Sequence, residues 1–385
     1  IIITAKIKNY KVRLEPTKEQ IELMFRTAGC TRFIYNWCLA FQKERREQGE
    51  KFISAMGMSK YLTALKKQDE YSWLKEVDSM ALVGAYTDAC TAFKNFFRGC
   101  KKGQKVGYPK FKSKKHSTPS FMPKYQSIRF NENQVRLPKI GMVKLSRKNY
   151  VPIVKKYSNP RVTFDGLNWY ISVGVEEAEN ISSELNGIIG IDLGLKDTAI
   201  LSTGKKYKNI NKTAHIKRIE KRLKKLQRQV SRKYEQNRQG KQYIKTNNII
   251  KLEKKINKLH KRLANIRNNY NHNITADIVN MNPAKIVIED LNIKGMMKNK
   301  HLSEAIGKQG LYEITRQLDY KCKFKGIELV KADRFFPSSK TCSNCGHVKK
   351  DLKLSDRIYI CPECGTVIDR DLNAAINLAN YKTEQ

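Results

Sequence analysis

The stretch Gly187-Ile-Ile-Gly-Ile-Asp-Leu-Gly194 decides the fold of the C-terminal half of the chain. It is a continuous apolar run bounded by glycine, which is typical of a buried strand. After a short turn at Lys196-Asp197, the segment Thr198–Ser202 predicts a second strand, antiparallel to the first. Asp192 therefore lies on a buried strand, where an ionised carboxylate is costly unless it is paired or binds a metal.

Downstream of this pair, helices and strands alternate. Apolar residues recur every three or four positions over residues 216–230 and 252–270, with a break at Asn237–Gly240, which predicts a long basic helical pair. Two further apolar runs, Lys285–Glu289 and Ile327–Val330, predict buried strands. This order of elements predicts an α/β domain, and the sequence has no fixed-period repeat.

The N-terminal half combines a helical region with short strands. Alternation of apolar and polar residues predicts a strand at Lys6–Leu14. Thr17 and Gln20 form a capping box, and helical periodicity continues from there to about Phe97. Short strands around an Asp-Gly turn are predicted at Arg161–Phe164 and Trp169–Val173.

The composition indicates a polyanionic partner. The 385 residues include 76 Lys+Arg against 36 Asp+Glu, a formal net charge of +40, and 40% of them are hydrophobic. Cores can therefore form, and a charge of this size is most simply explained by nucleic acid. No apolar run approaches the roughly 18–20 residues that would span a membrane. No secretory signal is expected, and the lack of a phosphate-binding loop argues against ATP hydrolysis.

A basic stretch between Gly99 and Lys115 is a candidate nucleic-acid contact. Aromatic side chains lie among its lysines, and such side chains can stack on bases. The alternatives stay open, because a basic run is more often a solvated face and the aromatics more often pack in a core. The candidate contact residues are Lys101, Lys102, Lys110, Lys112, Lys114, Lys115 and Tyr125.

Four of the nine cysteines form a metal-binding pattern. Cys342, Cys345, Cys361 and Cys364 make the spacing Cys-x2-Cys-x15-Cys-x2-Cys, and a glycine follows each pair. This spacing predicts a closed, structural four-thiolate zinc site, with the neighbouring His347 not a ligand. The other five cysteines show no disulfide spacing, are expected to be buried, and favour a reducing cytoplasm.

Carboxylates at the ends of apolar runs form the second candidate metal site. Besides Asp192, these are Glu289, which ends a predicted strand, and Asp369 and Asp371 at the start of an apolar-faced helix. Any one of them alone is more often a helix cap or a salt-bridged strand end. Together, hard oxygen ligands suit Mg²⁺ or Mn²⁺, and two such ions can hydrolyse a phosphodiester.

Taken in order, these motifs resemble TnpB, the transposon-encoded RNA-guided nuclease related to the type V CRISPR effectors. The resemblance rests on residues 190–194, 288–292 and 369–375 and on the two Cys-x-x-Cys-Gly knuckles. It extends over nearly the whole chain through the following N-terminal and zinc-entry segments: 13–20, 32–36, 107–112 and 338–342.

The resemblance implies a domain plan and a catalytic triad. Residues 184–385 would form an RNase H-like (RuvC) nuclease domain, with a basic helical hairpin at 213–270 and an inserted zinc ribbon at 337–368. Residues 1–16 and 98–183 would form a wedge-like β-barrel, interrupted by a helical recognition lobe at 17–97. Asp192, Glu289 and Asp371 would be the three RuvC carboxylates, with Asp369 the less favoured third ligand.

The function implied is an RNA-guided, Mg²⁺- or Mn²⁺-dependent DNA endonuclease in a prokaryotic cytoplasm. A structured guide RNA would pair with double-stranded target DNA beside a short flanking motif and displace one strand. The protein would be a monomer with one RNA and one structural Zn²⁺. The alternatives are a catalytically silent RNA-guided repressor, a compact effector guided by a CRISPR array, and a DNA-transposing enzyme that acts without RNA.

Overall fold

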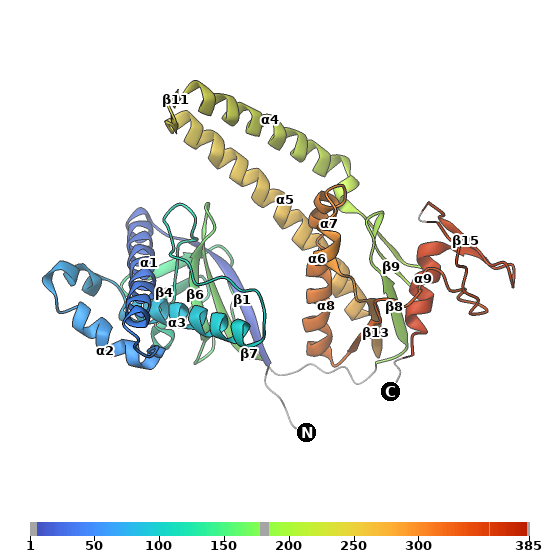
Figure 1. Ribbon diagram of the computed structural model, residues 1–385, viewed down its shortest axis with the longest axis horizontal. Helices are drawn as coiled ribbons and strands as arrows, with labels where there is room; N and C mark the ends of the chain where they lie inside the picture. The colour runs from blue at the N-terminus through green and yellow to red at the C-terminus, as the bar shows by residue number, and fades with distance from the viewer. Residues whose placement is uncertain (1–5, 178–184, 354, 383–385) are drawn as a thin grey trace. The chain divides into compact units, whose positions relative to one another are not determined.

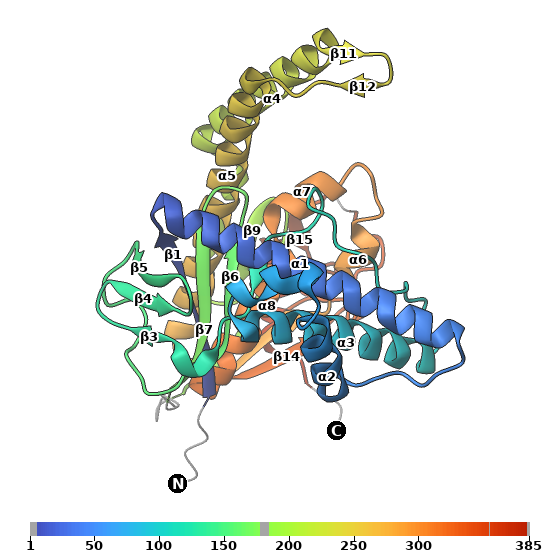
Figure 2. The same cartoon turned by 90° about the vertical axis from the view of Figure 1, so that its left-hand side faces the viewer.

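The computed structural model describes residues 6–177, 185–353 and 355–382 and divides the chain into two compact units. One unit is formed by residues 4–178 and the other by residues 179–385 with 1–3. Figures 1 and 2 show the elements of each. The predicted domain boundary at 183/184 lies outside the described residues.

Helices form one part of the unit of residues 4–178. They are α1 (Lys18–Glu47), α2 (Ala55–Leu65), the 3₁₀ segment η1 (Asp69–Glu76) and α3 (Ser79–Lys101). The capping box predicted at the start of α1 is confirmed, because the Thr17 hydroxyl and the Gln20 side chain accept hydrogen bonds from each other's backbone N–H groups. The core between the helices is apolar and includes the buried, free thiols of Cys38 and Cys90, whose sulfurs lie 4.0 Å apart.

Seven strands form the other part of this unit. They are β1 (Lys6–Glu15), β2 (Ser120–Phe121), β3 (Arg129–Phe130), β4 (Gln134–Leu137), β5 (Gly141–Leu145), β6 (Ser158–Phe164) and β7 (Trp169–Glu177), with η2 (Tyr125–Ser127) between β2 and β3. Their order is β2-β6-β7-β1-β5-β4-β3. The strands predicted at 6–14, 161–164 and 169–173 are all present.

This seven-stranded sheet is open, so the prediction of a β-barrel in this unit is wrong. β1 joins two halves, since Lys6–Arg13 pairs with β7 while Leu14–Glu15 pairs with β5. The two edge strands, β2 and β3, have only two residues each and do not pair with each other among the described residues. Strands this short supply too few ladder hydrogen bonds to close a barrel.

A five-stranded mixed sheet organises the unit of residues 179–385. It contains β8 (Ile188–Asp192), β9 (Asp197–Leu201), β10 (Lys206–Lys208), β13 (Lys285–Glu289) and β14 (Glu328–Ala332), in the order β10-β9-β8-β13-β14. β8, β13 and β14 are parallel, and β9 is antiparallel to β8 as predicted. The carboxyl ends of β8, β13 and β14 therefore share one edge of the sheet.

Helices cover both faces of this sheet. Ile286 and Ile288 point to a core shared with α5 (Asn247–Asn280) and α8 (Leu311–Lys325). Val287, which alternation places on the opposite face, packs with Leu378 of α9 (Arg370–Ala379). The short helices α6 (Ile293–Met296) and α7 (Ser303–Gln309) precede α8. This three-layer arrangement is the α/β domain that the sequence predicted.

The basic helical pair is a long hairpin that projects from the sheet (Figure 1). α4 (Ala214–Gln236) follows the 3₁₀ turn η3 (Ile210–Lys212), and β11 (Arg238–Gln239) and β12 (Gln242–Tyr243) form the tip before α5. Ile216, Ile219, Leu223 and Leu263 form the buried seam between the helices. At the base, Arg267 of α5 bonds Glu220 of α4 (2.8 Å) and Asn211 (2.7 Å).

The cysteine module lies between β14 and α9. It contains the antiparallel pair β15 (Ile358–Ile360) and β16 (Val367–Asp369), packed around the buried Tyr359. Of the five cysteines outside this module, four are buried as expected, whereas Cys100 is exposed near the end of α3. No helix in the described ranges has both the length and the apolarity to cross a membrane.

Candidate active site and cysteine cluster

Three carboxylates from distant parts of the sequence line one pocket. Asp192 is the last residue of β8, Glu289 is the last residue of β13, and Asp371 lies in the first turn of α9. The structure thus brings together the three residues that the sequence singled out, at the sheet edge where the parallel strands end. Each of the three side chains is half-buried.

Gly190 explains how α9 comes close enough to contribute its carboxylate. A Cβ atom at Gly190 would lie 2.0 Å from the carbonyl oxygen of Ala375 and 2.4 Å from the backbone nitrogen of Ala379. Only glycine permits so close an approach of a strand to a helix backbone. The Gly-Ile-Asp sequence of β8 therefore fixes both the position of Asp192 and the contact that places α9 beside it.

The electrostatic environment of Asp192 is unfavourable for its negative charge. Burial, followed by the charges of Glu289 and Asp371, raises the pKa of Asp192 to about 8, although Arg370 acts in the opposite direction. A bound cation would relieve this repulsion, so the donor set of three carboxylates fits a hard divalent metal such as Mg²⁺ or Mn²⁺.

Neighbouring side chains orient the other two carboxylates. The Ser338 hydroxyl donates a hydrogen bond of 2.6 Å to Oε1 of Glu289. The Arg370 guanidinium contacts Oδ1 of Asp371 at 3.1 Å. The three carboxylates line the same pocket. Their oxygens are not gathered as closely as the four cysteine sulfurs described below.

Asp369 has a different role. Its Oδ1 accepts hydrogen bonds from the backbone N–H groups of Asp371 (3.0 Å) and Leu372 (3.1 Å), which caps α9. Burial opposes ionisation, but the hydrogen bond from Lys206 and these backbone N–H groups lower the pKa of Asp369. Asp369 does not line the carboxylate pocket, which favours Asp371 as the third residue.

The pocket also has a cationic lining. Besides the carboxylates, it is lined by basic side chains from three segments, namely Lys196, Lys340, Lys353, Arg357 and Arg370. Carboxylates at the centre suit metal ions, and cations around them suit the phosphates of a nucleic-acid strand. The arrangement is therefore chemically suited to a phosphodiester.

The four cysteines of the predicted zinc motif form a compact cluster. Their sulfurs lie within 4.8 Å of one another, with Cys342–Cys364 and Cys345–Cys361 each at 3.6 Å. Gly346 and Gly365, which follow the two Cys-x-x-Cys knuckles, have φ values of 78° and 70°, a left-handed conformation that glycine adopts without strain. His347 is not part of the cluster and instead faces Glu363 at 3.7 Å.

Two asparagines attach the cysteine module to α9, the helix that carries Asp371, and the sequence interpretation missed them. Asn377 donates hydrogen bonds to the carbonyl oxygens of Ser338 (2.7 Å) and Thr341 (2.6 Å). Asn373 donates to Thr341 (2.7 Å) and accepts from the Ser343 backbone (2.9 Å). The sequence did carry a sign of this role, because Asn373 and Asn377 are polar residues on an otherwise apolar helix face. The entry to the cysteine module and the helix that carries Asp371 are thus held together.

The candidate nucleic-acid residues of the other unit do not form one cluster. Lys101, Lys102, Lys110, Lys114 and Lys115 are exposed, and Tyr125 is 40% exposed. In the described residues, none of these lysines has a carboxylate within 4.0 Å. Tyr108 instead packs against Phe93 and Phe96, which is the alternative role left open for the aromatics.

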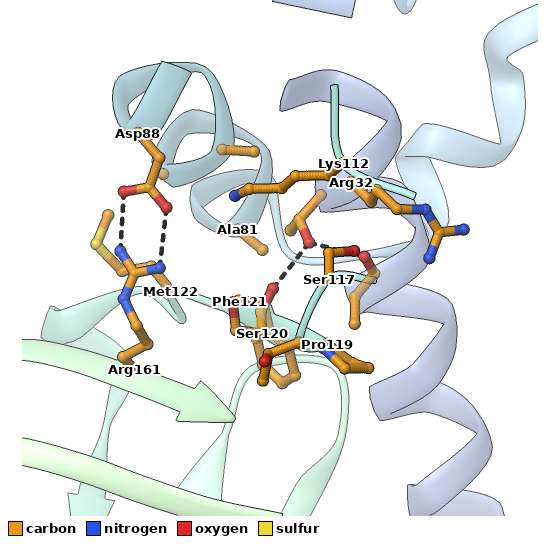
Figure 3. Close-up of a pocket in the computed structure, with 15 residues that line it drawn as sticks. Arg32, Ala81, Asp88, Lys112, Ser117, Pro119, Ser120, Phe121, Met122 and Arg161 are labelled. Atoms are coloured by element: carbon orange, nitrogen blue, oxygen red, sulfur yellow. Dashed lines mark hydrogen bonds and ion pairs between the residues drawn. The ribbon is translucent and has the colours of Figure 1, made fainter. Parts of the chain in front are cut away.

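Lys112 differs from the other lysines because it lies in a pocket (Figure 3). Its ammonium lies 3.8 Å from the ring centroid of Tyr35, and its backbone is clamped by two hydrogen bonds of 2.8 Å with Asn36. Burial lowers the pKa of Lys112. Arg161 in the same pocket is paired with Asp88, whereas Lys112 has no carboxylate within 4.0 Å in the described part of the chain.

Comparison with known proteins places these features in a family. Three family models match parts of the chain: a "Helix-turn-helix domain" at residues 6–51, a "Probable transposase" at residues 171–300, and a "Cas12f1-like, TNB domain" at residues 312–378. In this structure, residues 6–51 contain β1 and the single uninterrupted helix α1. The third match covers the cysteine cluster and the segment of α9 that carries Asp371.

Two curated relatives match almost the full chain. A protein of Streptomyces pristinaespiralis named "Putative RNA-guided DNA endonuclease" is 34% identical, covering 96% of this chain and 88% of the relative. A protein of Escherichia coli K12, named "Putative RNA-guided DNA endonuclease InsQ", is 32% identical over 97% of this chain and 92% of the relative.

A solved structure shows the same fold at lower sequence identity. The Cas12f1-sgRNA-target DNA complex contains a chain that matches with a TM-score of 0.62 at 15% identity, covering 98% of this chain and 99% of that one. Together with the carboxylate pocket and the cysteine cluster, the full-length relatives are decisive. This chain belongs to the TnpB family of RNA-guided DNA endonucleases.

Proposed function

We propose that this protein cuts DNA in the Asp192–Glu289–Asp371 pocket, at targets selected by pairing with a guide RNA that the protein carries. The observation that carries the proposal is the meeting of three carboxylates, far apart in sequence, in a pocket lined by cations. The strand order β10-β9-β8-β13-β14, with helices on both faces, supports an RNase H-like (RuvC) assignment for residues 184–385.

Asp192, Glu289 and Asp371 would hold the divalent metal. Mg²⁺ or Mn²⁺ bound there supplies activation of water and stabilisation of the leaving oxygen. The chain's own residues set the geometry for this chemistry. Ser338 orients Glu289, Arg370 orients Asp371, and the contact at Gly190 sets the approach of β8 to α9. The lining cations Lys340, Lys353 and Arg357 would bind phosphates of the scissile strand.

The cysteine cluster would hold one structural Zn²⁺. The four sulfurs lie within 4.8 Å of one another, and four thiolates would fill the ligand positions of one Zn²⁺ and leave none for substrate. Its contribution to cleavage would be indirect, because Asn373 and Asn377 bond the entry of the module to α9. Folding of the ribbon at 337–368 would thereby stabilise the helix that presents Asp371.

The exposed face of α4 supports binding to the backbone of a nucleic-acid duplex. Five cations follow one stripe of the helix at intervals of three or four residues: Lys217, Lys221, Lys224, Arg228 and Arg232. All are exposed, and within the described residues none has a carboxylate within 4.0 Å. The stripe extends for about 22 Å at 1.5 Å per residue, which is long enough to follow several phosphates.

The remaining roles follow the family plan. Residues 1–16 and 98–183 would act as the wedge-like domain and residues 17–97 as the recognition lobe. Lys101, Lys102, Lys110, Lys112, Lys114, Lys115 and Tyr125 would contribute contacts to nucleic acid. The partners would be one structured guide RNA per monomer, the double-stranded target and its displaced strand. The nine cysteines form no disulfide, and together with the bacterial relatives this supports a prokaryotic cytoplasm as the place of action.

A single preparation can test the proposal. The protein is purified with its co-expressed RNA, the RNA is sequenced, and a DNA matching its variable end is offered with Mg²⁺. Cleavage that is lost with EDTA, and also after RNase treatment, is the expected result. Cleavage that survives RNase would identify an RNA-independent enzyme instead. Guided binding without any cleavage in Mg²⁺ or Mn²⁺ would identify a silent repressor.

A further inference from the structure

Phe335 is the most exposed aromatic residue of the described chain. It is 87% exposed, although it belongs to the short loop that connects β14 to the cysteine module. Single exposed aromatic residues are common on protein surfaces, so the argument for a ligand rests on how and where the loop holds Phe335.

The loop around Phe335 is well anchored, so its exposure does not result from a lack of contacts. The Phe335 N–H donates to Oδ1 of Asp333 at 2.8 Å, and the Phe336 N–H donates to the Asp333 carbonyl at 3.1 Å. The Phe336 ring packs edge-on against Tyr381 with centroids 4.9 Å apart. Phe336 is therefore turned inward, while its neighbour is held outward.

The same loop is bonded twice to the end of β13. Arg334 pairs with Asp290 at 2.6 Å, and Ser338 donates to Glu289 at 2.6 Å. Phe335 is three residues from Ser338, so their Cα atoms are separated by at most about 11 Å. β14 ends at the sheet edge where β8 and β13 end, which is the edge that carries the active-site carboxylates.

We infer that Phe335 is a substrate-positioning residue whose ring stacks on a nucleobase of the unpaired DNA strand entering the carboxylate pocket. This inference rests on the proposed function. An aromatic ring stacks on any base, but only where the base is not already stacked within a duplex. A single strand held on this platform, with its phosphates among the lining cations of the pocket, would present one phosphodiester to the carboxylates.

The test compares Phe335→Leu with Phe335→Trp in the full-length, RNA-loaded protein. Leucine keeps the apolar bulk and removes the aromatic face, whereas tryptophan keeps that face. With single-stranded target DNA, Phe335→Leu should raise the half-saturating DNA concentration about 10-fold or more, with a smaller effect on the rate at saturation. Phe335→Trp should restore binding.

A fluorescence measurement tests the stacking without relying on DNA cleavage. All proteins in this measurement carry Asp192→Asn, and the probe is a single-stranded DNA with 2-aminopurine near the scissile position. Its fluorescence should be quenched by the protein that retains Phe335 and by the Phe335→Trp variant, and should recover with Phe335→Leu. If the wild-type protein cuts no DNA but this quenching occurs, the nuclease proposal fails while the stacking site stands.

Two results would overturn the inference. One is equal half-saturation and equal fluorescence for the wild-type protein and Phe335→Leu. The other is a marked fall in the unfolding temperature of nucleic-acid-free Phe335→Ala, because it would show that the ring packs against protein. An unchanged unfolding temperature is expected for a side chain with this exposure.

Discussion

Gly190 faces the backbone of α9 so closely that a Cβ on it would lie 2.0 Å from the carbonyl oxygen of Ala375. Gly190 lies two residues before Asp192, and Ala375 lies four residues after Asp371. The contact therefore connects the two elements that carry these carboxylates, β8 and α9. The geometry of the carboxylate pocket therefore depends on this helix–strand approach.

Gly190→Ala should impair both stability and cleavage. The added methyl group meets backbone atoms, which cannot rotate away, so the cost should be about 3 kcal/mol in the free energy of unfolding. The resulting displacement of Asp371 should lower the cleavage rate about 100-fold. Denaturant unfolding and single-turnover cleavage measure the two effects.

Gly307→Ala is the matched control for this substitution. Gly307 lies within α7, and its nearest neighbour in space would be 3.8 Å from an added Cβ. Alanine is a better helix former than glycine, so stability should be unchanged or slightly higher. Equal behaviour of the two variants would contradict the importance of the Gly190 contact.

Ser338→Ala should weaken the response of the enzyme to Mg²⁺. The hydroxyl of Ser338 orients Glu289 through its 2.6 Å hydrogen bond. Loss of such a contact to a metal ligand typically costs about 10- to 100-fold in metal affinity. The Mg²⁺ concentration for half-maximal cleavage should therefore rise, whereas Ser79→Ala, at an exposed position at the start of α3, should leave it unchanged. The same Mg²⁺ dependence for both variants would refute an orienting role for Ser338.

Removal of the cluster metal should unfold the ribbon and reduce cleavage indirectly. Cys361→Ser, or treatment with a zinc chelator, should increase hydrogen exchange over residues 341–367 and in α9, because Asn373 and Asn377 lose their partners. Guide RNA should remain bound. Cys100→Ser, which alters an exposed cysteine outside the cluster, is the control. Full cleavage and unchanged exchange without metal would argue against a structural ribbon.

Neutralising the α4 stripe should reduce the salt dependence of nucleic-acid binding. In Lys217→Gln/Lys221→Gln/Lys224→Gln, each lost phosphate contact should lower the slope of log K against log salt by about 0.7–0.9. Replacement of the same residues by arginine should retain the slope. Affinity titrations between low and moderate salt measure it. A slope that does not change in the glutamine variant would exclude the stripe from the interface.

Lys321 should make stability depend on pH. Burial lowers its pKa from 10.5 to about 8. The unfolded chain therefore binds the proton more tightly, and stability should rise as the pH increases from about 8 to 10.5. Lys321→Met removes the cost of burying the charge, so it should stabilise the nucleic-acid-free protein at pH 7 and stabilise it less at pH 10.

The gain in the free energy of unfolding for Lys321→Met should be about 1 kcal/mol larger at pH 7 than at pH 10, a small value because Lys321 is partly exposed. The substitution also removes the hydrogen bonds from Lys321 to the His272 carbonyl and the Thr275 hydroxyl. Lys331→Met, which alters an exposed lysine on β14, should show no such dependence. A gain for Lys321→Met that is the same at both pH values would contradict the assignment.

Local sequence patterns predicted the helices and strands well, but they did not predict contacts between residues far apart in the chain. Apolar runs and helical periodicity predicted β8, β13 and the α4–α5 hairpin, because these signals lie within a few residues of one another. The spacing of the cysteines predicted their cluster for the same reason. By contrast, the contact of Gly190 with Ala375 joins positions 185 residues apart, and no periodicity encodes it.

The same limit explains what was missed. Ser338, Asn373 and Asn377 act through tertiary hydrogen bonds, so their residue types alone did not reveal their roles. The open sheet of residues 6–177 depends on β1 changing partner from β7 to β5, which follows from how the strands pack rather than from the alternation within β1.

Cleavage of guide-matched target DNA by RNA-loaded Asp192→Asn, in Mg²⁺, tests the central claim most directly. The substitution keeps the size of the side chain and removes one hard, charged ligand from the carboxylate pocket. The account predicts a fall in the cleavage rate of about 1000-fold or more, with guide and target binding unchanged. A cleavage rate within about threefold of the wild-type rate would contradict it.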